Sequence, residues 1–454
     1  MSLVIISLVF VYTLIYKKLI QNDSILLNIE LFSFVFFFFL LLFPFNVMVK
    51  IYGLEEQEVI GLYRIEILVF TIFLISSLRR KVNFNLRDFG GNKTKLSSVG
   101  PFVIAVVSVF YLILALVEFY KFTGSFNIPF LYALQNKFNI VLFREYFWRL
   151  ALPRIPASSF IRYFAKYGSL ITAFVFFEQG KKFHFLVFLF LALMTFSIEG
   201  TKSSLMAIGV PLVLFVWFKR DSIGKVNKYI FTVVGITLII GTIFFSYVEA
   251  GGDWKYALLQ KTIYRIFLVP DYVAFNHYRY HITLGKFLWG ATNRIVLALK
   301  GGSDNVFGMH VLDYDNLIFN LAYRGFNAVV TVPIMGSFNG PFFIYGYVNF
   351  GYIGVILWSL IFVIINRFVE NLLKSSTHFY AFYSVFLWQV IMLITSQNLL
   401  DFLFGMEGLF PFLLIFYIFS SKSQKFRLTY GLIVYFTLAI TYNVIDIVLT
   451  HIAK

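Results

Sequence analysis

Apolar runs long enough to cross a lipid bilayer recur along this chain about twelve times, and this repetition constrains the fold more than any other feature. The chain has 454 residues, of which 60% are hydrophobic and 13% charged, and its mean hydropathy is +0.82. No soluble domain buries that much apolar surface, so lipid must cover it. The expected spans are 2–16, 25–49, 60–78, 100–120, 157–178, 184–199, 203–218, 229–248, 342–365, 379–402, 407–420 and 428–450.

A backbone in lipid has to satisfy its own hydrogen bonds, so these spans are predicted to be helices. The sequence therefore predicts one all-α integral membrane domain over residues 1–454, a polytopic bundle of about 12 transmembrane helices. The first run reaches Lys17 and Lys18 without a preceding basic segment or a small-residue cleavage site. We interpret it as a first span and not as a cleaved signal peptide.

Lysine and arginine gather in alternate short loops, and this pattern predicts the orientation of the spans. The side that carries them should be cytoplasmic, so both termini and the segments 121–156 and 249–340 should face outward. The formal net charge of +16 is then largely topogenic, and nucleic acid is not an expected partner. The basic residues concerned are Lys17, Lys18, Arg79, Arg80, Lys81, Arg87, Lys93, Lys95, Lys181, Lys182, Lys219, Arg220, Lys225, Lys228, Arg367, Lys374, Lys422, Lys425 and Arg427.

The segment 249–340 is the one long stretch too polar to lie in lipid. It holds three of the six histidines, His277, His281 and His310. A chain that only conducted a solute would need little of this, whereas a chain that handles a bulky, anionic, lipid-linked substrate at the membrane surface would need it. The cations of the segment are Lys255, Lys261, Arg265, Arg279, Lys286, Arg294, Lys300 and Arg324.

Two short patterns in this segment are candidates for chemistry. His277, Arg279 and His281 would share one face if extended, whereas in a helix only the two histidines would pair at i,i+4. Such a pair can bind zinc, but no His-Glu-x-x-His pattern and no third ligand of obvious spacing accompanies it, so we expect no metal. Asp313 and Asp315 flank Tyr314 and are candidates for a general base or for sugar-hydroxyl acceptors, although solvated loop carboxylates are commoner.

The smaller external segment, 121–156, is strongly basic, with Glu145 as its one acid after the helix end. Its arginines are either interface anchors or phosphate ligands, because guanidinium groups match phosphate oxygens bidentately. Arg162 and Lys166 follow one turn apart, which is costly in a membrane unless an anion or water meets them. The basic residues of the segment are Lys121, Lys137, Arg144, Arg149 and Arg154.

Three sequence patterns resemble the bacterial oligosaccharide repeat-unit (O-antigen or capsule) polymerases of the Wzy type. The first is an outward loop ending in Thr331 to Gly336, followed by Tyr347-Val-Asn-Phe-Gly-Tyr-Ile-Gly354 and an apolar span. The second is the turn Gly200-Thr201-Lys202-Ser203 between two mid-chain spans, where Lys202 stands in place of the usual Arg. The third is the Arg279-x10-Gly290 spacing.

The resemblance implies a glycosyltransferase C-like fold and a metal-independent glycosyltransferase without a cofactor. That enzyme would join undecaprenyl-diphosphate-linked oligosaccharides at the periplasmic face of the bacterial inner membrane, with a chain-length regulator and a flippase as partners. Within this hypothesis Arg279, His281 and Asp313 are the catalytic candidates. The candidate ligands of the diphosphate or substrate are Arg144, Arg149, Arg154, Lys202, Arg265, Arg294 and Arg324.

In this interpretation the two external segments meet over one cavity: the smaller one holds diphosphate, and the larger one supplies Arg279 and the sugar contacts. Two alternatives stay open. An O-antigen ligase would share the fold and the large loop. A flippase or other transporter would favour two symmetric halves and short loops, neither of which the sequence has.

Overall fold

The structure is a computed structural model of the chain, and every element of secondary structure in the part it describes is helical. The described residues are 29–42, 44–45, 49, 56–78, 99–124, 158–198, 203–219, 233–238, 240–241, 243, 253–255, 269–307, 311, 313–324, 339–374, 376–420, 432–445 and 448.

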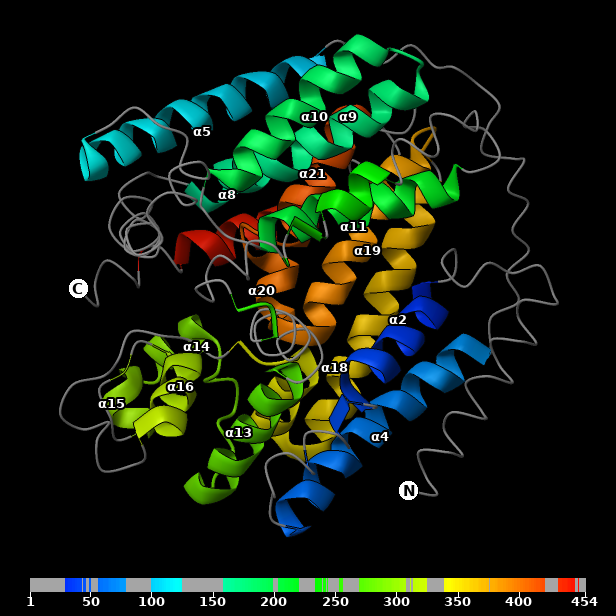
Figure 1. The fold of residues 1–454 in the computed structure, drawn as a ribbon. Coiled ribbons are helices and arrows are strands. Elements are labelled where there is room, and N and C mark those ends of the chain that lie inside the picture. Colours follow the sequence, from blue (N-terminus) through cyan, green and yellow to red (C-terminus); the bar gives the residue numbers. More distant parts are fainter. Residues whose placement is uncertain are drawn as a thin grey trace.

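The helices group along the chain into two series (Figure 1). The first series consists of α2 (Ile29–Phe37), η2 (Phe38–Leu42), α4 (Glu56–Leu78), α5 (Val99–Thr123), α8 (Ser158–Tyr163), η6 (Phe164–Gly168), α9 (Ser169–Glu178), α10 (Lys182–Ser197) and α11 (Ser203–Phe218). The second consists of α13 (Val269–Leu284), α14 (Arg294–Leu299), α15 (Gly302–Phe307), α16 (Tyr314–Arg324), α18 (Phe342–Lys374), α19 (Phe379–Ser396), α20 (Leu399–Phe404) and α21 (Leu409–Phe419).

By length and composition, six helical stretches in the described part can cross a membrane, and the chain is an all-α multi-pass membrane protein. The expected first span, 2–16, and most of 229–248 lie outside the described residues. Four shorter apolar helices are Ile29–Leu42, Lys182–Ser197, Leu205–Phe218 and Leu432–Ile445. The six longer ones are Glu58–Ser77, Val99–Thr123, Ser158–Glu178, Phe342–Lys374, Phe379–Ser396 and Leu399–Phe419.

The boundary between the expected spans 379–402 and 407–420 is wrong. Helix α19 ends at Ser396, because Gln397 and Asn398 are extended. The Asn398 side chain then caps α20 by accepting the backbone N–H of Leu400 at 3.0 Å. Residues 399–404 therefore belong with α21 and not with α19.

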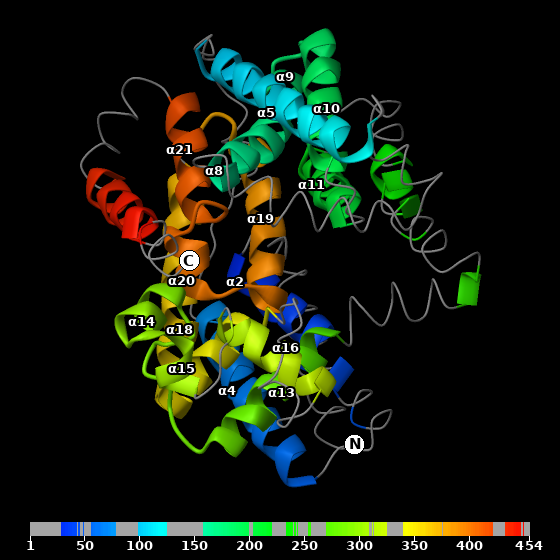
Figure 2. The ribbon, with the colours of Figure 1, turned by 90° about the vertical axis from the view of Figure 1, so that its left-hand side faces the viewer.

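Helix α19 lies between two groups of helices (Figures 1 and 2). It packs against α2 and α18 in one group and against α9 and α11 in the other. Helices α5, α8, η6, α9 and α10 pack on one another around α19's second set of neighbours, and α4 and α13 join α2 and α18. The non-spanning helices α13–α16 thus gather at one end of the second group.

Helix α18 reverses direction at Gly351, whose φ of 64° and ψ of −151° are not helical. The rings of Phe342 and Phe362 stack at 4.7 Å between centroids, although a straight helix would separate them by about 30 Å. The backbones of Gly346 and Gly354 approach so closely that neither has room for a Cβ. Residues 342–350 therefore form a short half-helix folded back on the long half, 352–374, and do not open a straight span as expected.

Helix α13 runs antiparallel to α4 with a fixed register. Arg279 pairs with Glu58 at 3.3 Å, and the hydroxyl of Tyr278 fills the space beside Gly61. Asp271 lies within electrostatic range of Glu66, near the middle of α4. The beginning of α13 is therefore level with the middle of an apolar span, so part of the segment 249–340 is inserted among the membrane helices.

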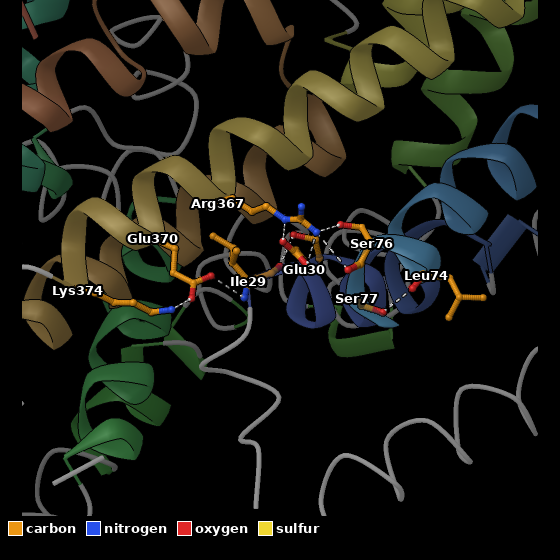
Figure 3. Close-up of polar contacts among 9 residues, drawn as sticks. Ile29, Glu30, Leu74, Ser76, Ser77, Arg367, Glu370 and Lys374 are labelled. Carbon is orange, nitrogen blue, oxygen red and sulfur yellow. Dashed lines mark hydrogen bonds and ion pairs between the residues drawn. The ribbon is translucent and has the colours of Figure 1, made fainter. Parts of the chain in front are cut away.

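Polar contacts join helix ends that alternation of the spans predicts on one side. In Figure 3, Arg367 near the end of α18 binds Glu30 at the start of α2 and Ser76 near the end of α4. Glu370 accepts from Lys374 at 2.5 Å and from the backbone of Ile29 at 3.4 Å. These helix ends lie together, as the distribution of basic loops indicates.

A second contact on the same predicted side centres on Glu178 at the end of α9. Its carboxylate lies 3.3 Å from Nζ of Lys219, just after α11, and 2.8 Å from Nδ1 of His378, just before α19. Because the three residues come from three different helix ends, this buried acid fixes how α9, α11 and α19 are aligned.

Candidate functional site

Helix α13 supplies the central residues of the candidate site. It begins at Val269 with Pro270 in the first turn, where the missing N–H of proline costs nothing. Because the segment is helical, His277 and His281 lie on one face, and Arg279 points to a different one. The alternative in which all three share a face is therefore wrong.

Arg279 faces α4. Its Nε atom lies 3.3 Å from a carboxylate oxygen of Glu58, and 47% of its side chain is exposed. The guanidinium group has five donors, so a single carboxylate leaves capacity for a second anion. Arg279 is thus positioned by Glu58 and still accessible.

On the other face of α13, a cluster forms from His277, Asp315 of α16 and Tyr345 of the short half of α18. We call it the Asp315 cluster. Tyr345 donates its hydroxyl to Oδ1 of Asp315 at 2.7 Å and accepts the backbone N–H of Gly340 at 2.8 Å. His277 Nε2 lies 3.8 Å from the same Oδ1 atom. His277 is buried, whereas 22% of the Asp315 side chain is exposed, so this carboxylate is oriented from below and open above.

His281 is buried one turn further along α13, between the rings of Phe287 and Tyr347 at 5.3 and 5.5 Å. Burial lowers its pKa to about 4, because the imidazolium form loses its hydration. His281 is therefore a neutral side chain at physiological pH, packed against aromatic rings.

Asp313 is the N-cap of α16. Its side chain accepts the backbone N–H of Asn316 at 2.8 Å, and its carbonyl accepts that of Leu317 at 3.0 Å. The Asp-x-x-Asn spacing before a helical pattern is the signal that predicts this role. Asp315, which the sequence treats as equivalent to Asp313, is the acid that faces the cluster.

The loop after α13 is bonded to the turn of α18. Asn349 donates to the hydroxyl of Thr292 at 2.7 Å and accepts the N–H of Gly290 at 2.8 Å. Trp289 N–H donates to the Asn349 carbonyl at 3.2 Å and adopts a positive φ of 50°. These bonds join the Arg279-x10-Gly290 stretch to the Tyr347–Gly354 stretch, which lie far apart in sequence.

A second polar group adjoins this loop. Asn293 caps α14 and donates to the Tyr442 hydroxyl at 2.6 Å, and Tyr442 donates to Asp401 of α20 at 2.7 Å. Asp401 also lies within electrostatic range of Tyr345, so this group borders the Asp315 cluster. Arg294 is the first residue of α14, directly after Asn293, and Arg324 is the last residue of α16.

Arg162 is buried and forms an ion pair with Glu407, in the turn between α20 and α21. An acid of the chain itself therefore meets this cation, which the sequence left open between a diphosphate and water. Lys166 lies 5.5 Å above the ring of Phe196.

The remaining predicted ligands lie outside the described residues. They are Arg144, Arg149, Arg154, Lys202 and Arg265, together with His310 and with Glu199 of the mid-chain turn. Within the described part, no group of three or more His, Asp or Glu side chains could hold a metal ion.

No family model, curated protein or solved structure matches the chain. The functional assignment therefore depends on the chemistry of the site.

Proposed function

We propose that this chain is a polysaccharide polymerase of the Wzy type. It joins undecaprenyl-diphosphate-linked oligosaccharide repeat units at the periplasmic face of a bacterial inner membrane and releases undecaprenyl diphosphate. The proposal includes a glycosyltransferase C-like arrangement, about 12 spans in the full chain and no metal or organic cofactor. A chain-length regulator and a flippase are its proposed partners.

The observation that supports this proposal best is the Asp315 cluster. A partly exposed carboxylate, hydrogen-bonded by Tyr345 and next to His277, lies among membrane helices on a half-helix and two non-spanning helices. Ionisable groups at such a position are costly and usually functional. A lipid-anchored sugar substrate would bring its hydroxyls and glycosidic bond to this level.

In the proposed reaction, a hydroxyl of the incoming unit attacks the anomeric carbon of the growing chain. The bond from that carbon to the diphosphate oxygen breaks, and the electron pair leaves with the lipid diphosphate. Asp315 accepts the hydroxyl proton, while Tyr345 and His277 hold its carboxylate in place. Arg279, positioned by Glu58, offers its remaining donors to the leaving diphosphate.

Purified protein incubated with defined lipid-linked repeat units tests this function directly. A ladder of products on a gel, formed without nucleotide sugar, is expected. Asp315→Asn and Arg279→Ala should reduce the ladder at least tenfold, and Asp313→Asn, which keeps a capping side chain, should not. Full ladder formation by both Asp315→Asn and Arg279→Ala would reject these roles.

The same assay separates the alternatives. A single transfer of preformed polysaccharide to a lipid acceptor, without a ladder, would identify a ligase. Movement of a labelled lipid-linked sugar across a vesicle membrane, without new glycosidic bonds, would identify a flippase.

A further inference from the structure

Two acidic side chains outside the Asp315 cluster are buried between α4 and α13. Glu66 lies near the middle of α4, and Asp271 lies in the first turn of α13. Both are completely buried, and both oxygens of each carboxyl group lack a hydrogen-bond partner in the described structure. Each is within electrostatic range of the other.

Two unbonded carboxylates cannot both stay charged in such a place. Burying one unpaired carboxylate costs several kcal/mol, and a second negative charge beside it adds repulsion. The helix N-terminus favours a negative Asp271, but that effect is worth only about 0.3–1 kcal/mol. Burial and the neighbouring Glu66 accordingly raise the pKa of Asp271 well above its ordinary value.

Other ionisable groups on the packed elements have partners elsewhere. Helix α4 and α13 pack against α2, η2, α18 and α16, and η2 contains only Phe and Leu. Glu30 of α2 and Glu370 of α18 pair with Arg367 and Lys374 at the other end of α4. Asp315 of α16 is held by Tyr345 of α18, as described above.

On α4 and α13 themselves, Tyr63 is the further ionisable side chain within electrostatic range of Glu66, and its hydroxyl carries no positive charge. Glu58 pairs with Arg279 two turns away. The remaining ionisable side chains with described interactions on these helices and on the facing part of α18 are Arg64, Tyr272, His277, Tyr278, Tyr280, His281, Tyr347 and Tyr352.

We propose that Glu66 and Asp271 form a proton-binding carboxyl pair that keeps α13 packed against α4. At neutral pH the pair holds at least one proton. Loss of that proton places two buried negative charges between the helices and drives them apart. Because α13 also carries His277 and Arg279, the geometry of the candidate site then depends on the protonation of this pair.

The sign of the pH dependence follows from the direction of the shift. An acid whose pKa is raised on folding stabilises the folded state fully below its unfolded pKa, about 4 for Asp and Glu. This stability is lost as the pH rises toward the folded pKa. The wild-type protein should therefore become less stable from acidic to alkaline pH, and uncharged replacements should remove that part of the dependence.

The test compares thermal unfolding of the full-length protein in detergent at several pH values. Glu66→Gln, Asp271→Asn and the double variant should unfold several degrees above the wild type at alkaline pH and match it at acidic pH. Glu30→Gln, a control at a buried acid that is paired with Arg367, should be less stable than the wild type at neutral pH and keep the wild-type alkaline loss. An alkaline loss in the double variant as large as in the wild type would overturn the proposal.

Infrared spectroscopy provides a second measurement that does not depend on how well the variants fold. The wild-type protein at neutral pH should show a protonated-carboxyl C=O band that disappears as the pH is raised. The band should be reduced in Asp271→Asn or Glu66→Gln. Absence of such a band at neutral pH from the wild-type protein would equally overturn the proposal. Neither measurement requires polymerase activity, so its outcome is independent of the proposed function.

Discussion

Tyr345 donates its hydroxyl to Asp315 at 2.7 Å, and through this bond a half-helix of α18 fixes the orientation of a carboxylate on α16. The same oxygen accepts the backbone N–H of Gly340, so three segments of the chain meet at one phenol. His277 packs its ring edge-on against Tyr345 at 5.5 Å between centroids. One side chain therefore positions both neighbours of the proposed reacting group.

Tyr345→Phe tests this relationship. The substitution removes a hydrogen bond to a charged acceptor and leaves the Gly340 N–H without its acceptor, which should cost about 1.5–3 kcal/mol of stability. Polymer formation should fall several-fold while substrate affinity changes little, because Asp315 is retained but less well oriented. Tyr352→Phe is the matched control on the same helix, since Tyr352 is exposed. Equal behaviour of the two variants would contradict a positioning role for Tyr345.

His281 predicts a loss of stability on the acidic side. Its pKa in the folded protein is about 4, below the ordinary value of 6.5. The unfolded state therefore binds more protons between these values, and stability should fall as the pH drops from about 6.5 toward 4. Allowing for partial solvent screening, the loss should be on the order of 2 kcal/mol.

His281→Phe should remove this acidic loss and preserve the ring contacts with Phe287 and Tyr347. The measurement is thermal unfolding between neutral and mildly acidic pH. An unchanged acidic slope in His281→Phe would show that another group is responsible.

The membrane class and the position of most helices could be predicted from the sequence, because apolar run length is a local property. The relationships that build the site are not local. Nothing near Asp313 and Asp315 distinguishes the capping acid from the one that faces Tyr345, because α18 decides this from thirty residues further along the chain.

Glu66 shows a signal that sequence analysis missed. A single acid inside the apolar run 60–78 is costly in a membrane and deserves interpretation as a functional candidate. Its neighbour Asp271 could not be predicted, because the antiparallel register of α4 and α13 comes from packing at Gly61 and Tyr278. The reversal at Gly351 was likewise hidden within a continuous apolar stretch.

The reversal in α18 predicts that its glycines tolerate no side chain. At Gly351 the φ of 64° with a ψ of −151° belongs to a region that only glycine adopts readily, so Gly351→Ala should cost about 1–3 kcal/mol. Gly346→Ala and Gly354→Ala would each press a Cβ into the backbone of the facing half-helix. Gly100→Ala is the control, because its Cβ would meet the flexible side chain of Ile418. Folded yield and unfolding temperature measure these effects, and wild-type values for Gly346→Ala and Gly354→Ala would contradict the close packing of the two halves.

The ion pair between Arg162 and Glu407 should respond unequally to loss of either partner. The Arg162 side chain is 5% exposed, whereas that of Glu407 is 43% exposed. Glu407→Gln therefore removes the carboxylate that neutralises a buried cation. Arg162→Met leaves an acid that water can solvate and fills the same space with an apolar chain. Breaking a buried pair costs about 3–5 kcal/mol, and the exposure of Glu407 reduces this to roughly 1–3 kcal/mol for Glu407→Gln. Arg162→Met should cost less, and the double variant should resemble Arg162→Met. If Arg162 instead serves to bind a diphosphate, Arg162→Met should abolish polymer formation at unchanged stability, and the unfolding and ladder assays together distinguish the two roles.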